Sequence, residues 1–428
     1  TTGRRMFYEG PIKYSGDVFR DAGMTTGGIH INHPHYHCGS AHINPLPYKT
    51  AKLADGTGEL TMAVTSYPHL QRTVWRISLH PDEAAFRLGY RFENLAPYPM
   101  GFNPWINAAC EVRPDTQFIL PAGWVADHWF GINDDKLYRL DPWPIDAEGR
   151  DQSYLAKSTR PSAFGYSVTE GFCGIYYHDA DVGHARVFDP DQMPAAKEFG
   201  VWNTNNSPGW CEVWGAFSHN MEDPLWIAPH ETIEGADTWF PIHGIHGMTW
   251  ASDGGAVNLK KDGGQLACGV FMPRDHGPCA LRLITDGNPL IEAACELSPA
   301  KPFFRAVPCP ENTDEVRLTV SDGAGRVLLT HHCFLAPRPR PQFVLPDKPW
   351  HRRTLVTQAR WQEAFTPMMS WGPWYHPPKT YADALAANPA DTEALIGRAR
   401  SLIKEATAAL FRGRPAKVAP DDERKEAA

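Results

Sequence analysis

The sequence predicts a mainly β protein, and three observations support this fold class. The 428 residues include 36 Gly and 39 Pro, many of which separate short segments of chain. Those segments are rich in β-branched and aromatic residues, which strands favour. Aromatic residues are also numerous, with 15 Trp, 14 Tyr and 20 Phe. Short strands with frequent turns indicate a large sandwich or barrel rather than a helical protein.

Residues 1–250 predict the larger of two β domains. Turn residues such as Pro81-Asp82 and Asp134-Asp135 bound its segments. The region is too long for a small immunoglobulin-like unit, so we expect a wide sandwich with long loops. Its expected strands are, in chain order, Leu60–Ser66, Thr73–Leu79, Phe86–Phe92, Gln117–Leu120, Gly174–Tyr177, Ala185–Phe188, Cys211–Phe217 and Thr238–Phe240.

The composition changes after about Trp250, and residues 251–336 predict a second, smaller β-sandwich. The sequences "KDGGQ", "TDGNP" and "SDGAGR" within it are hairpin or turn signals. A unit of about 85 residues is within the ordinary range of domain sizes. Its expected strands are Ala256–Leu259, Leu266–Phe271, Ala280–Thr285, Phe303–Ala306, Glu315–Ser321 and Arg326–Phe334.

Two further segments follow the second sandwich. Residues 337–380 are expected to be a linker, which "PRPRP" stiffens in polyproline geometry. Residues 381–428 predict a helical tail, because apolar residues recur at helical spacing after Asp391, a good N-cap. We expect this tail to contact a protein partner or a second copy of the chain.

Charge and composition exclude several classes of function. The formal net charge of −8 argues against a nucleic-acid partner, whose phosphates need a basic surface. No apolar run reaches the roughly 18 residues of a membrane helix. The nine cysteines are scattered without a CxxC pair, which favours free thiols in a reducing compartment. We therefore expect a cytoplasmic protein, or a periplasmic one if a signal peptide has been removed.

The usual cofactor and nucleophile motifs are also missing from the sequence. It contains no GxGxxG, no GxxxxGK[ST] and no GxSxG. Nucleotide binding and a serine-hydrolase elbow therefore have no support, and no cofactor is expected.

Histidines are densest in "GGIHINHPHYH", which spans residues 27–37. In an extended strand His33, His35 and His37 would share one face, although Pro34 favours a loop. Converging imidazoles suit a polar substrate pocket or proton transfer, with His30, His33, His35 and His37 as substrate-binding candidates. Metal ligation and a structural polar loop are the alternatives. No HExxH-type spacing supports a metal site, so none is predicted.

Carboxylates form the second candidate set. Trp210, Glu212 and Trp214 would point to one side of an extended strand. An acid among aromatic rings is desolvated, which raises its pKa and suits it to general acid catalysis. The alternative is a glutamate paired with an arginine on a solvated face. Asp127-His128 and Asp141 are further candidates for the site.

Tryptophans form the third set. Large flat rings stack on the apolar faces of pyranose rings, and they also fill cores. Trp105, Trp143 and Trp210 are the expected stacking platforms, because polar residues or prolines lie close to them in the sequence. About half of the tryptophans are expected to belong to the core.

The order of several motifs resembles a bacterial domain family. The motifs are "GRRMFYEGPIKY", "GGIHINHPHYH", "INPLPYKT", "YRFENLAPYPMGFNPWINAA", "TQFILPAGWVADHWFG", "DPWPID", "FCGIYYHDADVGHARVFDP", "WCEVWGAFSHN" and "TWFPIHGIHGMTWA". That family has a galactose-mutarotase-like β-supersandwich followed by tetratricopeptide repeats, is known as a domain of unknown function, and is linked to carbohydrate metabolism. Its members usually begin with further strands, so an N-terminal piece of the sandwich is expected to be missing, trimmed or supplied by another chain.

The resemblance implies a sugar site on the concave face of the larger sheet. The family commonly has an acidic residue at the position of His30, so a carboxylate role there is not carried over. By position, the concave face is implied to include His30, His33, His35, Asn107, Asp127, His128, Glu212 and His243.

The predicted function is that of a carbohydrate-active enzyme, with a glycoside hydrolase acting on an oligosaccharide or glycoside as the first hypothesis. Glu212 is the expected general acid or base, with Asp127 or Asp141 as second carboxylate and His128 beside it. Asn107, the histidines and His243 would hold sugar hydroxyls. The alternatives are a sugar epimerase or mutarotase, a non-catalytic glycan-binding or scaffold protein, and a polysaccharide lyase.

Overall fold

The computed structural model describes the greater part of the two β domains. The described residues are 6–7, 28–32, 46–66, 70–98, 100–102, 104–126, 140–159, 164–166, 168, 170–192, 195–197, 210–217, 225–335, 385–386, 388–392, 394–396, 398–399 and 402.

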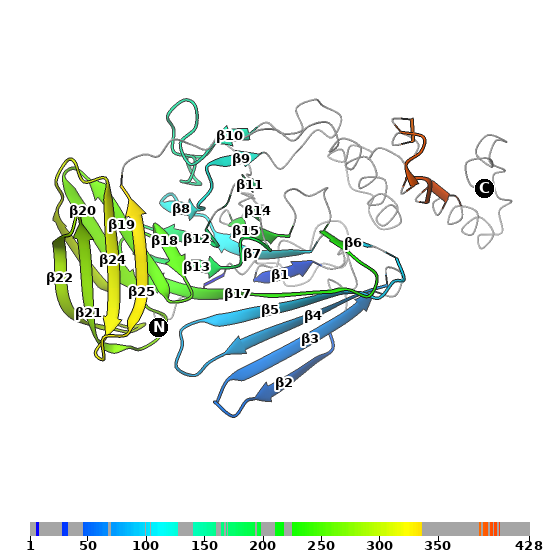
Figure 1. The fold of residues 1–428 in the computed structure, drawn as a ribbon, viewed down its shortest axis with the longest axis horizontal. Helices are drawn as coiled ribbons and strands as arrows, with labels where there is room; N and C mark the ends of the chain where they lie inside the picture. Colours follow the sequence, from blue (N-terminus) through cyan, green and yellow to red (C-terminus); the bar gives the residue numbers. More distant parts are fainter. Residues whose placement is uncertain are drawn as a thin grey trace.

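An eight-stranded sheet forms one layer of the first domain (Figure 1), and all of its strand pairs are antiparallel. Its strands are, in spatial order, β2 (Tyr48–Lys52), β3 (Gly58–Ser66), β4 (Gln71–Leu79), β5 (Phe86–Asn94), β17 (Thr232–His243), β13 (Val182–Val187), β12 (Phe172–Tyr177) and β8 (Thr116–Ile119). Strands that are adjacent in this sheet thus come from both the first and the second half of the domain's sequence.

A seven-stranded antiparallel sheet forms the second layer. Two short strands, β6 (Met100–Phe102) and β16 (Leu225–Ile227), pair with each other and form a separate two-stranded sheet. The order in the seven-stranded sheet is β1 (Ile29–Asn32), β7 (Trp105–Glu111), β15 (Trp210–Ala216), β14 (Ala195–Lys197), β11 (Phe164–Tyr166), β9 (Trp124–Ala126) and β10 (Leu140–Pro142).

The core of the first domain lies between these two sheets. Alternate residues of each strand point to opposite faces, so each sheet contributes every second side chain. Ile106 and Val213 come from the seven-stranded sheet, while Trp75, Phe92 and Ile175 come from the eight-stranded one. All of them belong to one cluster of buried side chains, which makes the domain a two-layer sandwich.

Two four-stranded sheets make up the second sandwich, which has its own core. Gly263 and Gly264 adopt positive φ of 52° and 80° in the two-residue turn between β19 and β20, as the "KDGGQ" hairpin signal predicts. One sheet has the order β18 (Trp250–Ser252), β19 (Gly255–Asp262), β20 (Gln265–Phe271) and β23 (Phe303–Pro308), and the other β22 (Asn288–Leu297), β21 (Gly277–Thr285), β24 (Glu315–Asp322) and β25 (Val327–Phe334).

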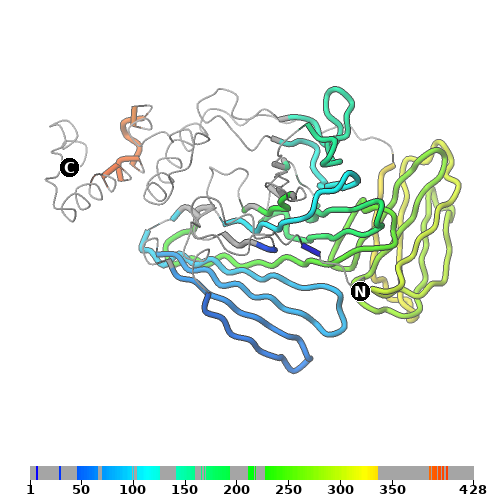
Figure 2. Tube along the Cα trace, turned by 180° about the vertical axis from the view of Figure 1, so that it is seen from behind, coloured from blue at the N-terminus to red at the C-terminus, as the bar shows by residue number. Residues whose placement is uncertain are grey.

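A third apolar cluster joins the two sandwiches. It contains Tyr176 and Phe240 from the eight-stranded sheet together with Ile245, Met248 and Phe271. Strand β12 is therefore buried along its whole length, because one face meets the first core and the other face meets this junction. Figure 2 shows the second sandwich standing at the end of the first.

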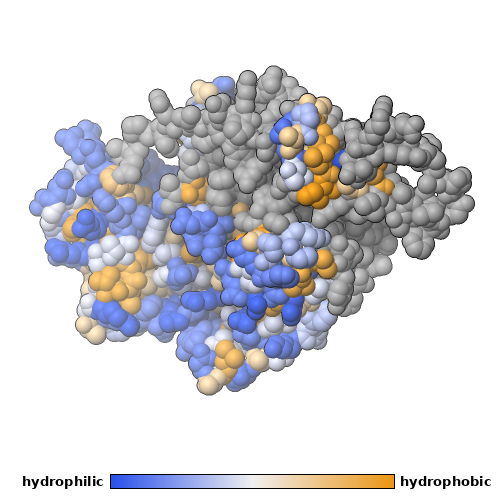
Figure 3. All heavy atoms as spheres, turned by 45° about the vertical axis from the view of Figure 1, so that its right-hand side comes forward, coloured by the Kyte–Doolittle hydropathy of each residue, from blue (hydrophilic) through white to orange (hydrophobic). Residues whose placement is uncertain are grey.

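The exposed large apolar side chains of the described residues come from several separate elements. Tyr48, Leu79 and Val327 are large, exposed and come from different strands. On the face drawn in Figure 3, hydrophobic residues appear as separate patches among hydrophilic ones. Such scattered exposure is normal for a folded protein. In the described part of the chain, no helix is long and apolar enough to cross a membrane.

This architecture confirms the predicted fold class, a large β-supersandwich followed by a smaller sandwich. Every segment predicted as a strand overlaps an observed one. Eleven strands within the described ranges were not predicted, namely β1, β2, β6, β7, β9, β10, β11, β14, β16, β18 and β22. The eight cysteines within the described ranges are free thiols.

The helical tail is described at a few positions. Residues 394–396 are helical, and the amide of Ala394 donates to Oδ1 of Asp391 at 3.2 Å. This confirms the N-cap predicted at Asp391. The predicted linker, residues 337–380, lies outside the described residues.

Candidate functional site

The candidate site lies on the face of the seven-stranded sheet that turns away from the core. In β15, Cys211 and Val213 belong to the core cluster between the sheets. Their neighbours Glu212 and Trp214 alternate with them and so lie on the other face. The predicted alternation around Glu212 is thus present in the structure.

The strand register brings distant parts of the sequence to this face. His30 of β1 is directly opposite Asn107 of β7, and Asn107 is directly opposite Trp214 of β15. Glu212 lies two residues before Trp214, opposite Ala109. Directly opposite residues of an antiparallel pair lie on one face, as do residues two apart on one strand. Strand β1, which carries His30, is therefore linked to the strand of Glu212 through β7.

Aromatic rings and polar groups are buried together on this face. Trp105 and Trp214 stack with their ring centroids 4.6 Å apart and their planes inclined by 29°. The exposed fractions are 1% for Glu212 and 4% for Asn107. Neither tryptophan belongs to the core clusters formed by the described residues. The second side of the sheet thus carries a desolvated group of aromatic and polar side chains.

The side-chain oxygen of Asn107 has no donor among the described residues. This Oδ1 atom is buried and accepts no hydrogen bond from the part of the chain that the structure describes. Buried polar atoms without partners are rare in native proteins, and each costs about 1–3 kcal/mol. A hydroxyl or water that donates to this oxygen would remove that cost. Asn107 therefore suits the hydroxyl-holding role predicted for it.

The carboxyl group of Glu212 acts on the thiol of Cys211, its neighbour on the other face of β15. Burial raises the pKa of the Cys211 thiol, and the nearby Cys110 thiol and Glu212 carboxyl raise it further. A neutral, buried thiol is a poor nucleophile, so Cys211 is suited to core packing. Glu111, the carboxylate at the end of β7, is bonded to Arg113 at 2.6 Å and forms an ion pair.

The structure places three predicted residues away from this site. Trp143 lies in the core, 3% exposed, with its Nε1 donating to the Leu120 carbonyl at 3.2 Å. Its ring fills the core, so we do not keep it as a stacking platform. His243 bonds through Nε2 to the Pro299 carbonyl at 2.7 Å, at the junction of the sandwiches.

Asp141 is the third residue that the fold separates from Glu212. It lies on β10 directly opposite Val125, a residue of the core cluster. The register therefore places Asp141 at a core-side position of the sheet, whereas Glu212 lies on the opposite face. Asp141 does not suit the role of second carboxylate.

The remaining candidates lie outside what can be compared. His33, His35, His37, Asp127 and His128 fall outside the described residues. For His30 and Trp210 the structure gives the backbone register, with Trp210 opposite Glu111. In the described ranges, no group of three or more His, Cys, Asp or Glu residues could hold a metal ion.

Trp214 lies on this face but was not among the tryptophans predicted to stack on a sugar. Its spacing of two from Glu212 is the signal that could have placed it there. Its stacking on Trp105 could not be read from the sequence, because the two rings are brought together by the pairing of β7 with β15.

Comparison with solved structures gives similarities of low sequence identity. A TPR-domain containing protein from Parabacteroides distasonis is 18% identical over 50% of this chain and 37% of its own, with a TM-score of 0.41. A putative aldose 1-epimerase from Klebsiella pneumoniae is 14% identical over 56% of this chain and 72% of its own, with a TM-score of 0.40. A putative mutarotase from Salmonella typhimurium is 12% identical over 56% of this chain and 80% of its own, with a TM-score of 0.38. This chain thus spans about a third of the Parabacteroides protein.

Family profiles match both β domains, whereas no curated protein matches the sequence. Residues 250–331 match the second domain of YphG-like proteins. Residues 1–217 match a domain of unknown function, DUF5107, which covers just over half of the 428 residues. The chain therefore belongs to the DUF5107 family.

Proposed function

We propose that this protein is a carbohydrate-active enzyme that acts at the anomeric centre of a sugar, with Glu212 as its proton-transferring group. One observation carries the proposal: Glu212, Asn107 and the Trp105–Trp214 stack are buried together on the side of the seven-stranded sheet that does not face the core. A buried carboxylate, an acceptor with no donor among the described residues, and flat rings match the three parts of a pyranose, namely its reactive oxygen, its hydroxyls and its apolar face.

Each residue has a role in this proposal that follows from its chemistry. A carboxyl group withdrawn from water transfers a proton more readily near neutral pH than an exposed one. Oδ1 of Asn107 accepts a hydrogen bond from a ring hydroxyl and thereby fixes the orientation of the sugar. The indole pair gives the site a rigid apolar wall.

Glycoside hydrolysis is the first form of this reaction. It needs a second carboxylate, which activates water or attacks the anomeric carbon. Asp127 takes this role in the proposal, because Asp141 is on the core side and Glu111 is bound by Arg113. His30 and the following histidines then bind hydroxyls of the glycoside.

Epimerisation or mutarotation of a free aldose is the second form. The core-side position of Asp141 favours this reaction over hydrolysis. Mutarotation needs one carboxylate as base and one other group as acid, whereas glycoside hydrolysis needs two carboxylates. Glu212 would remove the proton of the anomeric hydroxyl while an imidazole protonates the ring oxygen, which opens the ring. Reclosure on the other face of the carbonyl carbon gives the other anomer.

Proton NMR separates the candidates. The protein is incubated with single anomers of aldoses and, separately, with oligosaccharides, and the anomeric signals are followed with time. Faster interconversion of anomers indicates a mutarotase, and new reducing ends indicate a hydrolase. Glu212→Gln is expected to lose most turnover and to retain sugar binding. Glu234→Gln, an exposed glutamate bonded to Arg91, is the matched control and is expected to keep turnover.

Full activity of the Glu212→Gln protein would refute the proposed role of Glu212. Sugar binding with no turnover in the unmodified protein would instead identify a glycan-binding protein, the non-catalytic alternative.

A further inference from the structure

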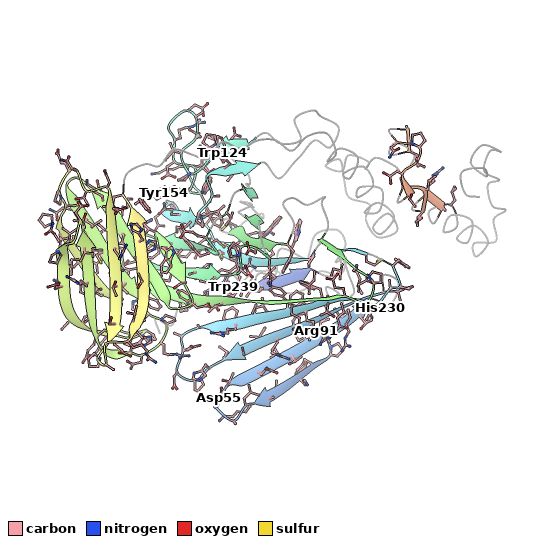
Figure 4. The ribbon with its side chains drawn as sticks, viewed as in Figure 1. Asp55, Arg91, Trp124, Tyr154, His230 and Trp239 are labelled. Atoms are coloured by element: carbon pink, nitrogen blue, oxygen red, sulfur yellow. The ribbon has the colours of Figure 1, made fainter. Side chains whose placement is uncertain are left out.

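A buried ion pair lies between the two sheets, directly behind the candidate site. Arg186 of β13 and Asp237 of β17 are both 0% exposed. The guanidinium donates through Nε and Nη2 to Oδ2 of Asp237, at 2.8 and 2.5 Å. It also lies over the ring of Trp239, 5.2 Å from the centroid; Figure 4 labels this tryptophan on β17.

The guanidinium reaches across the core to the two strands that carry the site. Its Nη1 lies 3.5 Å from the carbonyl oxygen of Ile106 in β7. It also lies against Gly215 of β15, where a Cβ atom would be 2.1 Å from Nη2 and 2.2 Å from Nη1. Ile106 and Gly215 are directly opposite each other in the sheet. Glycine is therefore required at 215 for this approach.

The contact points are adjacent in sequence to the site residues. Ile106 lies between Trp105 and Asn107, and Gly215 follows Trp214. These neighbours point to the opposite side of the sheet from the guanidinium. A displacement of either backbone at Ile106 or Gly215 would therefore move the stacked indoles and the amide of Asn107.

Stability alone is a weak reason for burying this pair. The desolvation of two charges offsets most of their attraction, and apolar replacements of buried pairs are often as stable. A fork of fixed geometry does, however, restrict the position of what it touches. We propose that Arg186, held by Asp237, is a positioning residue that sets the relative placement of β7 and β15 and thereby the geometry of the Trp105–Trp214 stack.

Circular dichroism of the ligand-free protein tests this proposal. Two stacked indoles couple their transitions and give a paired positive and negative band in the far ultraviolet. In each protein, the contribution of the stack is the spectrum minus that of the same protein carrying Trp105→Phe. The variants are Arg186→Lys, which keeps the charge and loses the fork, Gly215→Ala, which places a methyl group at the guanidinium, and Asp237→Asn, which removes the anchoring charge.

Two matched controls separate positioning from general destabilisation. Arg91→Lys alters a half-exposed arginine of β5, labelled in Figure 4, that bonds to Glu93 and Glu234. Gly89→Ala adds a methyl group in β5 at an ordinary distance of 3.6 Å from its nearest neighbour. All spectra are recorded well below the unfolding temperature of each variant, so that lower stability by itself does not change them.

We expect the paired band to be largely lost in the three variants of the ion pair and to be kept in both controls. A band of full size in the folded variants of Arg186, Asp237 and Gly215 would overturn the proposal, as would an equal loss in the controls. The relevance to sugars rests on the function proposed above. The spectra need no ligand, so this inference and that function fail separately.

Discussion

Replacing Asn107 with leucine is expected to stabilise the protein while abolishing sugar binding. Leucine branches at the same atom, Cγ, and brings no polar atom to the buried position. The substitution removes an acceptor, Oδ1, that has no donor among the described residues. An unsatisfied buried acceptor costs about 1–3 kcal/mol, so the free energy of unfolding should rise by about that amount. For a domain of this size, the unfolding temperature should rise by about 2–10 °C.

Thermal unfolding with and without sugar measures both effects. In the absence of ligand, the Asn107→Leu protein should unfold at the higher temperature. A sugar at about 100 times its dissociation constant stabilises the unmodified protein by about 2.7 kcal/mol, and the variant should gain nothing. The difference between the two unfolding temperatures should therefore become smaller or change sign when sugar is added.

Asn94→Leu is the matched control in the same domain. Asn94 is also buried, but its amide donates to the carbonyls of Tyr98, Ile227 and Ala228, and its Oδ1 accepts from the amide of Ala96. Its replacement leaves those groups unpaired and should destabilise the protein by several kcal/mol. If Asn107→Leu were as destabilising as Asn94→Leu, the amide of Asn107 would have a structural role and our interpretation would be refuted.

Three further predictions concern residues outside the site. Burial lowers the pKa of His184 to about 4, so only the unfolded chain takes up its proton between about pH 6.5 and pH 4. The free energy of unfolding should fall as the pH falls through this window. In chemical denaturation, His184→Phe should make this loss of stability smaller by about 3 kcal/mol. An unchanged pH dependence of stability in the variant would contradict this prediction. Trp143→Phe removes the bond to Leu120 and should cost about 1–3 kcal/mol, with sugar affinity, measured by calorimetry, unchanged; weaker affinity would return Trp143 to the site. Asp391→Ala should weaken the tail helix by about 1 kcal/mol, seen as faster hydrogen exchange at Ala394, whereas an unchanged exchange rate would exclude the cap.

The local features of the candidate site could be predicted where the sequence alternates. In "WCEVW", polar or aromatic residues alternate with apolar ones, because one face of β15 meets the core and the other does not. The prediction that Glu212 and its flanking tryptophans share a face follows from this pattern alone. Glu212 is buried and lies on the same face of β15 as Trp214, which agrees with this prediction.

Strand β7 shows where such prediction fails. Its residues Trp105–Cys110 are all buried, so "WINAAC" has no alternation by which a strand could be recognised. One face is buried in the core and the other beneath the site's tryptophans. The same difficulty applies to the core position of Trp143, because a tryptophan beside prolines has the same local pattern whether it lies in a core or in a pocket.

The amino-acid sequence by itself determined the β class, the two sandwiches and the acid flanked by tryptophans, since these depend on side-chain periodicity and turn chemistry within short stretches. Only the tertiary structure decided which strands are neighbours. It joined His30 to Asn107 and Trp214, separated Asp141 from Glu212, and brought Arg186 against Gly215. The physical reason is that strand pairing and sheet packing are chosen by the whole core at once, through contacts between residues far apart in the chain, which no local pattern encodes.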